Sequence, residues 1–243
     1  MKISKHIPKE LVGAACSVWK KFDQTSALVK LVADGKASGL LLAGQPGIGK
    51  SRIVINTLAS TGMIRGLSYM HRKGYASPLG FYQLLYRNPD ILSVLDDYDK
   101  ILRDRIGIDM LKAVLDHDKQ RTLSYDSTSL DSKGMKRSFD YTGQLIFISN
   151  QRLENIDEAV YSRCLKRDLV LDPDEILARM YDLIYVMEPE TDIEIKLEVI
   201  QFLNDQRDVL YETDRFNLRV FSNAIDLHST GRNDWKDLVM ECA

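Results

Sequence analysis

The chain has 243 residues, 44% hydrophobic and 28% charged, and a formal net charge of -2, values typical of a soluble globular protein with one large or two smaller domains. The small net charge gives no sign of bulk attraction to nucleic acid, and three widely separated cysteines argue against a disulfide framework or a zinc module and favour a reducing compartment. No apolar run approaches membrane-spanning length and no signal-peptide core opens the sequence, so we expect a cytoplasmic protein without a membrane partner.

Two helices are predicted before the first strand. The first covers 8–22, because Pro8 suits the first helical position and apolar residues recur behind it at helical spacing. The second is short, covers 26–33 and should stop near Gly35. An apolar run at 39–43 then predicts a buried strand.

The segment that follows this strand is the most informative of the chain. Residues 44–51 read G-Q-P-G-I-G-K-S and match the phosphate-binding pattern G-x-x-x-x-G-K-S, and a helix is predicted over 51–58. The glycines let backbone N–H groups approach the phosphates of a nucleotide, and the start of the helix adds positive partial charge there. Lys50 can reach the β- and γ-phosphates, while the Ser51 hydroxyl can bind Mg²⁺. The predicted nucleotide-binding residues are Gly44, Pro46, Gly47, Ile48, Gly49, Lys50, Ser51 and Arg52.

Strands and helices continue to alternate after this loop. Further strands are predicted at 67–70, 91–95, 145–148 and 167–171. One helix begins at Ser77–Pro78 and another covers 108–115, while the polar segment 121–141 has strand-like residues at both ends. This alternation predicts the α/β fold class, with a parallel sheet covered by helices.

Only helices are predicted in the last part of the chain. Asp172 and Glu175 have the spacing of a capping box, and an apolar stripe at helical spacing follows them. The segment from 193 alternates like a strand at first, but its apolar pattern continues well beyond this start, so we predict a helix. Asn217 and Asn233 are predicted to cap two more helices.

Two acids follow the predicted strand 91–95. Asp96 is placed to hold Mg²⁺, directly or through water, together with Ser51. Asp97 is placed to orient and activate an attacking water. An apolar strand before a polar turn is common by itself, but its distance of about 45 residues from a P-loop favours the metal-binding interpretation.

The predicted strand 145–148 ends in Ser149 and Asn150. An amide at this place can position the hydrolytic water beside the γ-phosphate of a nucleotide. A turn-forming asparagine after a strand is the alternative.

Together, a strand with a P-loop, a strand with paired acids, a strand with an amide and a final set of helices resemble the AAA+ ATPases, over roughly 40–227. The resemblance implies a nucleotide-binding α/β core over 1–171, with a parallel P-loop sheet flanked by helices, and a small all-helical lid domain over 172–243. It also implies that the protein binds ATP with Mg²⁺ and hydrolyses it, with Asn150 in the role of sensor 1.

The resemblance assigns roles to arginines as well. Residues 159–164 are similar to the Ser-Arg-Cys segment of clamp-loader ATPases, in which Arg163 would be the arginine finger that reaches the γ-phosphate on a neighbouring subunit. Arg167 is the second candidate for this finger. The segment 217–219 resembles sensor 2, in which Arg219 on the lid touches the nucleotide of its own subunit. For each arginine the alternative is an ordinary surface charge.

Position 97 departs from the pattern of many members of this superfamily, which have Glu there. Asp is shorter by one methylene, so water activation is expected to be weaker or differently placed, and Asp99 is a second candidate for that work. The segments 77–86, 96–99 and 111–116 look most like small phage-encoded AAA+ ATPases, and the chain resembles clamp-loader ATPases more distantly. A phage origin would place the protein in the cytoplasm of the host.

Two segments lie where AAA+ rings carry loops that contact a substrate. Segment 71–76 combines basic residues with an aromatic, which suits a phosphate backbone with base stacking or an extended peptide; the alternative is a solvated connection. Segment 121–141 is predicted to form a hairpin with its tip near 132–134, and hairpins at this place often touch DNA in the channel of the ring. A flexible insertion is the alternative. The positive charges of this segment near its tip come from Lys133, Lys136 and Arg137.

The resemblance implies a homo-oligomer, a ring or spiral for which a hexamer is expected, that couples ATP hydrolysis to work on DNA in replication or recombination. A protein-remodelling ATPase and a slowly hydrolysing, nucleotide-dependent scaffold that recruits a protein partner are the alternatives. A GTPase would use the same P-loop, but the sequence has no Asn-Lys-x-Asp segment of the kind that recognises guanine in many GTPases.

Overall fold

The computed structural model describes residues 4–118 and 120–242. The chain divides into two compact units. The sheet unit contains Gln24–Gly44 and Lys50–Leu169, and the helical unit contains Met1–Asp23, Gln45–Gly49 and Val170–Ala243. Within the described ranges, no helix is both long enough and apolar enough to cross a membrane.

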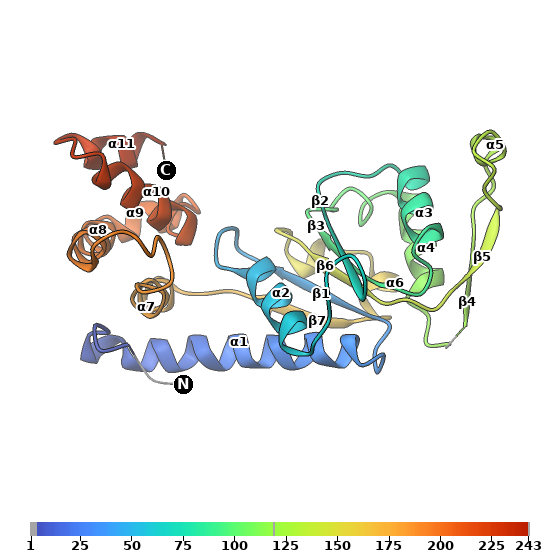
Figure 1. The fold of residues 1–243 in the computed structure, drawn as a ribbon, viewed down its shortest axis with the longest axis horizontal. Coiled ribbons are helices and arrows are strands. Elements are labelled where there is room, and N and C mark those ends of the chain that lie inside the picture. The colour runs from blue at the N-terminus through green and yellow to red at the C-terminus, as the bar shows by residue number, and fades with distance from the viewer. Residues whose placement is uncertain (1–3, 119, 243) are drawn as a thin grey trace. The chain divides into compact units, whose positions relative to one another are not determined.

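The sheet unit is built on five parallel strands in the order β2-β3-β6-β1-β7 (Figure 1). They are β1 (Gly39–Gly44), β2 (Tyr69–Lys73), β3 (Leu92–Asp96), β6 (Leu145–Ile148) and β7 (Leu165–Leu169). Every residue of β1, β3 and β6 is buried, as expected for central strands of a parallel sheet covered on both faces. Gly39 of β1 and Ser93 of β3 both pair with Leu145 of β6, so the carboxyl ends of these strands meet at one edge. The predicted α/β fold is confirmed.

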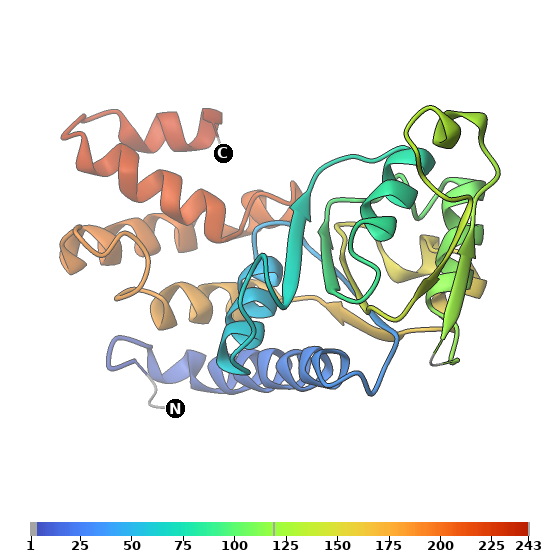
Figure 2. The same ribbon diagram turned by 45° about the vertical axis from the view of Figure 1, so that its right-hand side comes forward.

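Helices cover this sheet on both sides (Figure 2). Those of the sheet unit are α2 (Lys50–Ser60), α3 (Pro78–Tyr86), α4 (Arg105–Val114) and the short α6 (Glu158–Tyr161), with a 3-10 turn, η2 (Leu153–Asn155), before α6. Ser77 caps α3 as predicted, because its hydroxyl accepts a hydrogen bond from Gly80 N at 3.2 Å. Buried side chains of α3 and α4, such as Phe81 and Leu111, pack with Leu95 and Phe147 of the sheet.

An arm projects from the sheet unit (Figure 1). It consists of the antiparallel strands β4 (Arg121–Ser124) and β5 (Ser138–Tyr141), with the short helix α5 (Thr128–Asp131) between them. The predicted hairpin is therefore confirmed, and a short helix precedes its predicted tip. The buried Arg121 fixes the base of the arm, since its guanidinium donates to Val114 O at 2.6 Å and to Gly143 O at 2.5 Å.

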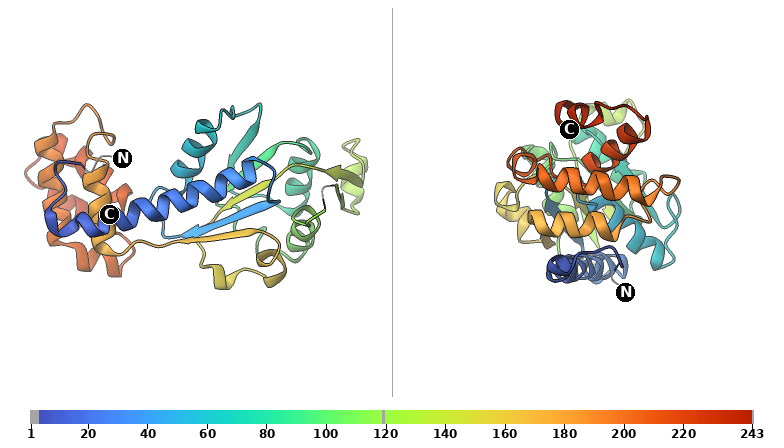
Figure 3. Two further views of the ribbon diagram at one scale, coloured as in Figure 1. Left: turned by 90° about the horizontal axis from the view of Figure 1, so that it is seen from below. Right: turned by 90° about the vertical axis from the view of Figure 1, so that its left-hand side faces the viewer.

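The helical unit contains five helices of the C-terminal region. They are α7 (Pro173–Asp182), α8 (Ile193–Asp205), α9 (Arg207–Glu212), α10 (Leu218–Ser229) and α11 (Trp235–Cys242). Figure 3 shows α7, α8 and α10 packed against one another. Their buried residues include Ile176, Ile200 and Phe221. The predicted capping box of Asp172 and Glu175 and the helical assignment of the segment from 193 are both confirmed.

The predicted start of the fold is wrong in one respect. A single helix, α1 (Val12–Ala33), follows a 3-10 turn, η1 (Lys9–Leu11), where we expected two helices. No glycine or proline interrupts the chain between Gly13 and Gly35, and the junction residue Thr25 is fully buried. Burial of this part of the helix therefore outweighs the polar character of 23–25, where we expected the break.

Two strand positions also differ from the prediction. β2 begins at Tyr69 instead of residue 67, because the Ser68 hydroxyl and the Ile64 carbonyl close a turn and Leu67 is 70% exposed. β7 runs over Leu165–Leu169 rather than 167–171, because it pairs with Leu40–Gly44 of β1. A local turn therefore limits β2 and the partner strand limits β7, and local apolar character sets neither limit.

We expect Asp172→Ala to lower the free energy of unfolding by about 1 kcal/mol, because the first turn of α7 loses its capping acceptor. Asp172→Asn should retain most of the stability, since asparagine also caps helices well. Urea denaturation followed by circular dichroism measures the difference, with the exposed Glu212→Ala as the control. Equal stability of Asp172→Ala and wild type would contradict the capping role.

Candidate functional site

A group of polar side chains lies where β1, β3 and β6 end. We call Lys50, Ser51, Asp96, Asp97 and Asn150 the acid–lysine cluster, and all of them belong to the sheet unit. Ser51 Oγ donates to Asp96 Oδ2 at 2.7 Å. Lys50 Nζ donates to Asn150 Oδ1 at 2.9 Å, and Asn150 Nδ2 donates to Asp97 Oδ1 at 3.0 Å. The structure thus brings together five residues that the sequence placed in three separate motifs.

Lys50 has an unusual environment for a lysine. Its side chain is buried, and its ammonium also donates to Gly44 O at 2.7 Å. Burial lowers the pKa of Lys50 to about 8, and the nearby carboxylates of Asp96 and Asp97 only partly offset this effect. The ammonium is therefore little exposed to water, so a ligand of high negative charge would be attracted to it strongly.

The P-loop glycines are required by the backbone. Gly44, Gly47 and Gly49 have φ values of 140°, 72° and 99°, which side-chain-bearing residues rarely adopt. A Cβ on Gly44 would lie 2.0 Å from Leu169 O, and one on Gly47 would lie 2.7 Å from Asn217 Cγ. Gly44 and Gly47 therefore have no room for a side chain, and the approach of phosphates to this backbone stays a prediction.

Within the helical unit, the P-loop residues 45–49 lie against the start of α10. Leu218 N donates to Gly47 O at 3.1 Å. Asn217 caps α10 as predicted, because its Oδ1 accepts from Arg219 N and Val220 N. Arg219 consequently lies in the first turn of α10, with an exposed side chain.

The oxygens of Ser51 and Asp96 fit a magnesium ion that is shared with a nucleotide. Both are hard oxygen ligands and lie within hydrogen-bond distance of each other. Mg²⁺ in nucleotide sites usually takes one or two protein oxygens together with phosphate oxygens and water. Across residues 4–118 and 120–242, no group of three or more His, Cys, Asp or Glu side chains could hold a metal ion alone. Ser51 and Asp96 could therefore serve as protein ligands of Mg²⁺ together with oxygens from other sources.

Two side chains of β2 also approach Asp96, and the sequence motifs did not predict them. Lys73 Nζ lies 3.1 Å and His71 Nε2 lies 3.4 Å from Asp96 Oδ2. Burial lowers the pKa of His71 below its usual range, more strongly than the hydrogen bond to Asp96 raises it. Of the two side chains of β2 that approach Asp96, Lys73 is therefore the one that supplies positive charge at neutral pH.

The two other acids after β3 have separate partners. Asp97 is exposed and has a left-handed φ of 62°, which asparagine and aspartate tolerate better than most residues. Asp99, the second candidate for water activation, instead accepts a hydrogen bond from the buried Ser149 Oγ at 2.6 Å. Ser149 also accepts from Gln151 N, so Asp99 anchors the turn that carries Asn150.

The predicted site arginines of the sheet unit lie elsewhere than in the acid–lysine cluster. Arg163 Nη1 donates to Ala159 O at 2.7 Å, one turn back along the chain. Arg167 lies on β7 and donates to Gln24 Oε1 at 3.1 Å, and Arg52 is exposed in the first turn of α2. The choice between Arg163 and Arg167 as a finger for a neighbouring subunit stays a prediction.

The two expected substrate loops differ from each other. In segment 71–76, residues 71–73 belong to β2, so the loop begins only at Gly74; this part of the prediction is wrong because β2 extends along β3. Tyr75 in this loop is 64% exposed, and Lys100 Nζ lies 4.6 Å from the centre of its ring. On the arm, by contrast, Arg137 forms ion pairs with Asp126 and Asp131.

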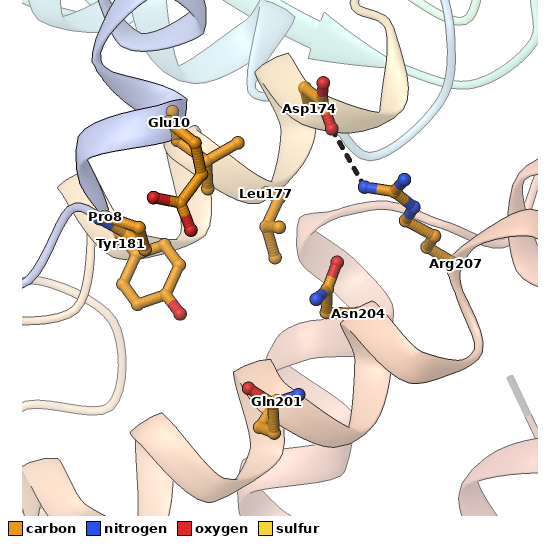
Figure 4. Close-up of a pocket in the computed structure, with 9 residues that line it drawn as sticks. Pro8, Glu10, Asp174, Leu177, Tyr181, Gln201, Asn204 and Arg207 are labelled. Atoms are coloured by element: carbon orange, nitrogen blue, oxygen red, sulfur yellow. Dashed lines mark hydrogen bonds and ion pairs between the residues drawn. The ribbon is translucent and has the colours of Figure 1, made fainter.

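A cavity of about 330 Å³ lies in the helical unit and is lined by none of the predicted site residues (Figure 4). Glu10, Tyr181 and Asn204 point toward it, and an ion pair of 2.9 Å joins Asp174 to Arg207 at its rim. Its lining comes from the N-terminal turn, α7, α8 and the start of α9. No motif in the sequence indicated this cavity.

Comparison with known proteins gives one curated relative and several similar structures. No protein-family model matches the chain. The chain is 29% identical to an uncharacterized 36.7 kDa protein in the nrdC-mobD intergenic region of Enterobacteria phage T4, in an alignment that covers 68% of this chain and 55% of the relative. The chain thus spans about half the length of this curated relative.

Among solved structures, the RuvB Holliday junction branch migration motor of Thermotoga maritima is similar over 97% of this chain and 70% of its own, with a TM-score of 0.53 and 16% identity. Domain III of the Thermotoga maritima replication initiation protein DnaA is similar over 91% of both chains, with a TM-score of 0.53 and 14% identity. Identities this low show a shared fold, with its α/β sheet and C-terminal helices.

The buried ammonium of Lys50 predicts a pH-dependent stability. Above pH 8 the folded protein releases the Lys50 proton, whereas the unfolded chain keeps it up to about pH 10.4, so the free energy of unfolding should rise with pH. Between pH 8 and pH 10 we expect wild type to gain about 1.4 kcal/mol per pH unit relative to Lys50→Met. Urea unfolding of both proteins at several pH values tests this expectation, which a constant difference would contradict.

Proposed function

Because the chain has the AAA+ P-loop fold, we propose that it is an ATPase that binds ATP with Mg²⁺ and hydrolyses it as a homo-oligomer. The observation that carries this proposal is the acid–lysine cluster, in which Lys50, Asn150 and Asp97 form a hydrogen-bonded chain beside the pair of Ser51 and Asp96. These are the groups that phosphoryl transfer requires: a cation for the phosphates, oxygens for the metal and an acid for the water.

The P-loop would bind the phosphates. Gly47 and Gly49 keep the backbone open to close approach, and Lys50 supplies a buried ammonium for the β- and γ-phosphates. A phosphate that accepts from Lys50 Nζ would compete with Asn150 Oδ1 for this ammonium. The amide of Asn150 is then available to orient a water beside the γ-phosphate.

Ser51 and Asp96 would hold Mg²⁺, which when bound neutralises charge on the phosphate oxygens. Asp97 would accept a proton from the attacking water, as a general base. Its exposed carboxylate is already aligned by Asn150, and its left-handed backbone is the kind of local strain that accumulates at functional positions. The short side chain of Asp97 favours slow turnover.

An oligomer would complete this site. Arg163 is proposed as the arginine finger for a neighbouring subunit, with Arg167 as the alternative, and Arg219 as the contact to the nucleotide in its own subunit. The position of Arg219 in the first turn of α10, two residues from the Asn217 side chain that lies against Gly47, supports the second role. A ring or spiral of six subunits is the form expected from the fold.

The names of the similar structures favour a role on DNA, since one is a Holliday junction branch migration motor and another a replication initiation protein. The exposed Tyr75 beside Lys100 supports nucleic-acid contact at that loop. On the arm, Arg137 is held in ion pairs with Asp126 and Asp131, so contact with a phosphate backbone there would rely on the exposed Lys133 and Lys136. The phage relative supports action in the cytoplasm of an infected host.

The first test is ATP hydrolysis by wild type and Lys50→Ala. We expect Lys50→Ala to lose about a hundredfold or more of the rate, because a charge that stabilises the transition state is removed. The rate per wild-type subunit should rise with protein concentration and with added DNA. Lys36→Ala, which removes an exposed lysine of the same unit, is the matched control.

Nucleotide binding without appreciable turnover would favour the scaffold. A turnover that depends on Lys50 but ignores single- and double-stranded DNA would exclude the DNA-linked motor and direct the search to a protein partner.

The proposed role of Arg163 as the arginine finger can be tested by mixing two inactive variants. Arg163→Ala and Lys50→Ala should each be nearly inactive alone. In an equal mixture, about a quarter of the sites would join an intact Lys50 to an intact Arg163 of the neighbour, so about a quarter of the wild-type rate should return. No recovery on mixing would mean that Arg163 acts within its own subunit or is only structural, and the same experiment with Arg167→Ala would then test the alternative.

A further inference from the structure

Three side chains contact the same carboxylate oxygen of Asp96. Its Oδ2 accepts from the Ser51 hydroxyl at 2.7 Å, and Lys73 Nζ and His71 Nε2 lie within 3.1 Å and 3.4 Å of the same atom. A carboxylate oxygen offers about two lone-pair positions, so this oxygen is already fully used. A cation that binds this oxygen must therefore compete with the groups already in contact with it.

The pairing of β2 with β3 fixes this contact. Lys73 and Asp96 are register partners, each the last residue of its strand, and Gly74 N donates to Asp96 O at 2.9 Å. The Asp96 side chain is 4% exposed, whereas the Lys73 side chain is 62% exposed. A buried carboxylate needs compensation for its charge, while an exposed lysine can swing into solvent at little cost.

We propose that Lys73 is an internal counter-ion that occupies Asp96 in the nucleotide-free protein and is displaced when Mg²⁺ binds. This inference rests on the proposed function, in which Asp96 and Ser51 hold the metal. The ammonium and Mg²⁺ are both cations and compete for the same oxygen. Lys73 therefore weakens Mg²⁺ binding and keeps Asp96 compensated until metal and nucleotide arrive together.

His71 is not an equivalent competitor. Its side chain is 7% exposed and packs beside Asp96, so it cannot leave without a change in the surrounding structure. Lys50 is the other cation close to Asp96, but its ammonium is engaged with Gly44 and Asn150. Of these three basic groups, Lys73 combines a positive charge, contact with Asp96 and freedom to move.

The test measures metal dependence of binding rather than activity. A non-hydrolysable ATP analogue is titrated calorimetrically at a series of Mg²⁺ concentrations, which gives the Mg²⁺ concentration that produces half of the maximal gain in affinity. We expect Lys73→Met to lower this concentration by about three- to tenfold, the range expected when a partly exposed ionic competitor is removed. Lys73→Arg, which keeps the charge, should stay within about twofold of wild type.

The matched control is Lys100→Met. Lys100 is an exposed lysine of the same unit that bonds Tyr75 rather than Asp96, so its loss reports the general effect of removing one positive charge. If Lys73→Met and Lys100→Met lower the required Mg²⁺ concentration equally, the change is a general effect of removing one positive charge. This result would overturn the proposal. An unchanged Mg²⁺ requirement in Lys73→Met would also overturn it and would mean that the metal uses the other oxygen of Asp96.

Asp96→Asn separates this inference from the function on which it rests. If the Mg²⁺ dependence of binding disappears in Asp96→Asn but Lys73→Met behaves like wild type, the metal site stands and the counter-ion role fails. If Asp96→Asn retains the full Mg²⁺ dependence, the proposed metal site itself is wrong.

Discussion

The burial of the Lys50 ammonium is the interaction on which the site depends. The charge is tolerated because the Gly44 carbonyl and the Asn150 amide accept from it where β1 and β6 end side by side. Gly44 can take this place only because it lacks a Cβ, which would collide with Leu169 of the neighbouring strand. The parallel sheet, the glycine and the buried lysine are therefore parts of one arrangement, and its low-dielectric setting strengthens any attraction to phosphate.

The three aspartates at the end of β3 and just after it lie in three different environments. Asp96 is buried among Ser51 and the groups from β2, Asp97 is exposed and aligned by Asn150, and Asp99 is tied to Ser149. Neighbouring carboxylates repel one another unless each has its own partner. The separate partners would allow these acids to act as metal ligand, water-activating group and structural anchor in the proposed function without competing for the same role.

The two surfaces that the sequence marked as basic have different characters in three dimensions. The loop at Tyr75 leaves its aromatic ring and Lys100 exposed, whereas the arm uses Arg137 in ion pairs with its own acids. The arm also rests on an aromatic group in which the Tyr82 ring contacts Tyr86, Tyr125 and Phe139. On the arm, the exposed Lys133 and Lys136, rather than the ion-paired Arg137, are the side chains available to attract a phosphate backbone.

The sequence by itself determined the P-loop, the buried central strands, the hairpin and the helix caps at Ser77, Asp172 and Asn217, because each depends on residues close together in the chain. Only the tertiary structure decided that α1 is continuous, where β2 and β7 begin, and that Lys73 and His71 contact Asp96. These features depend on strand pairing and burial between distant segments. Local pattern can encode a backbone conformation, but the partner of a side chain is set by which strands become neighbours.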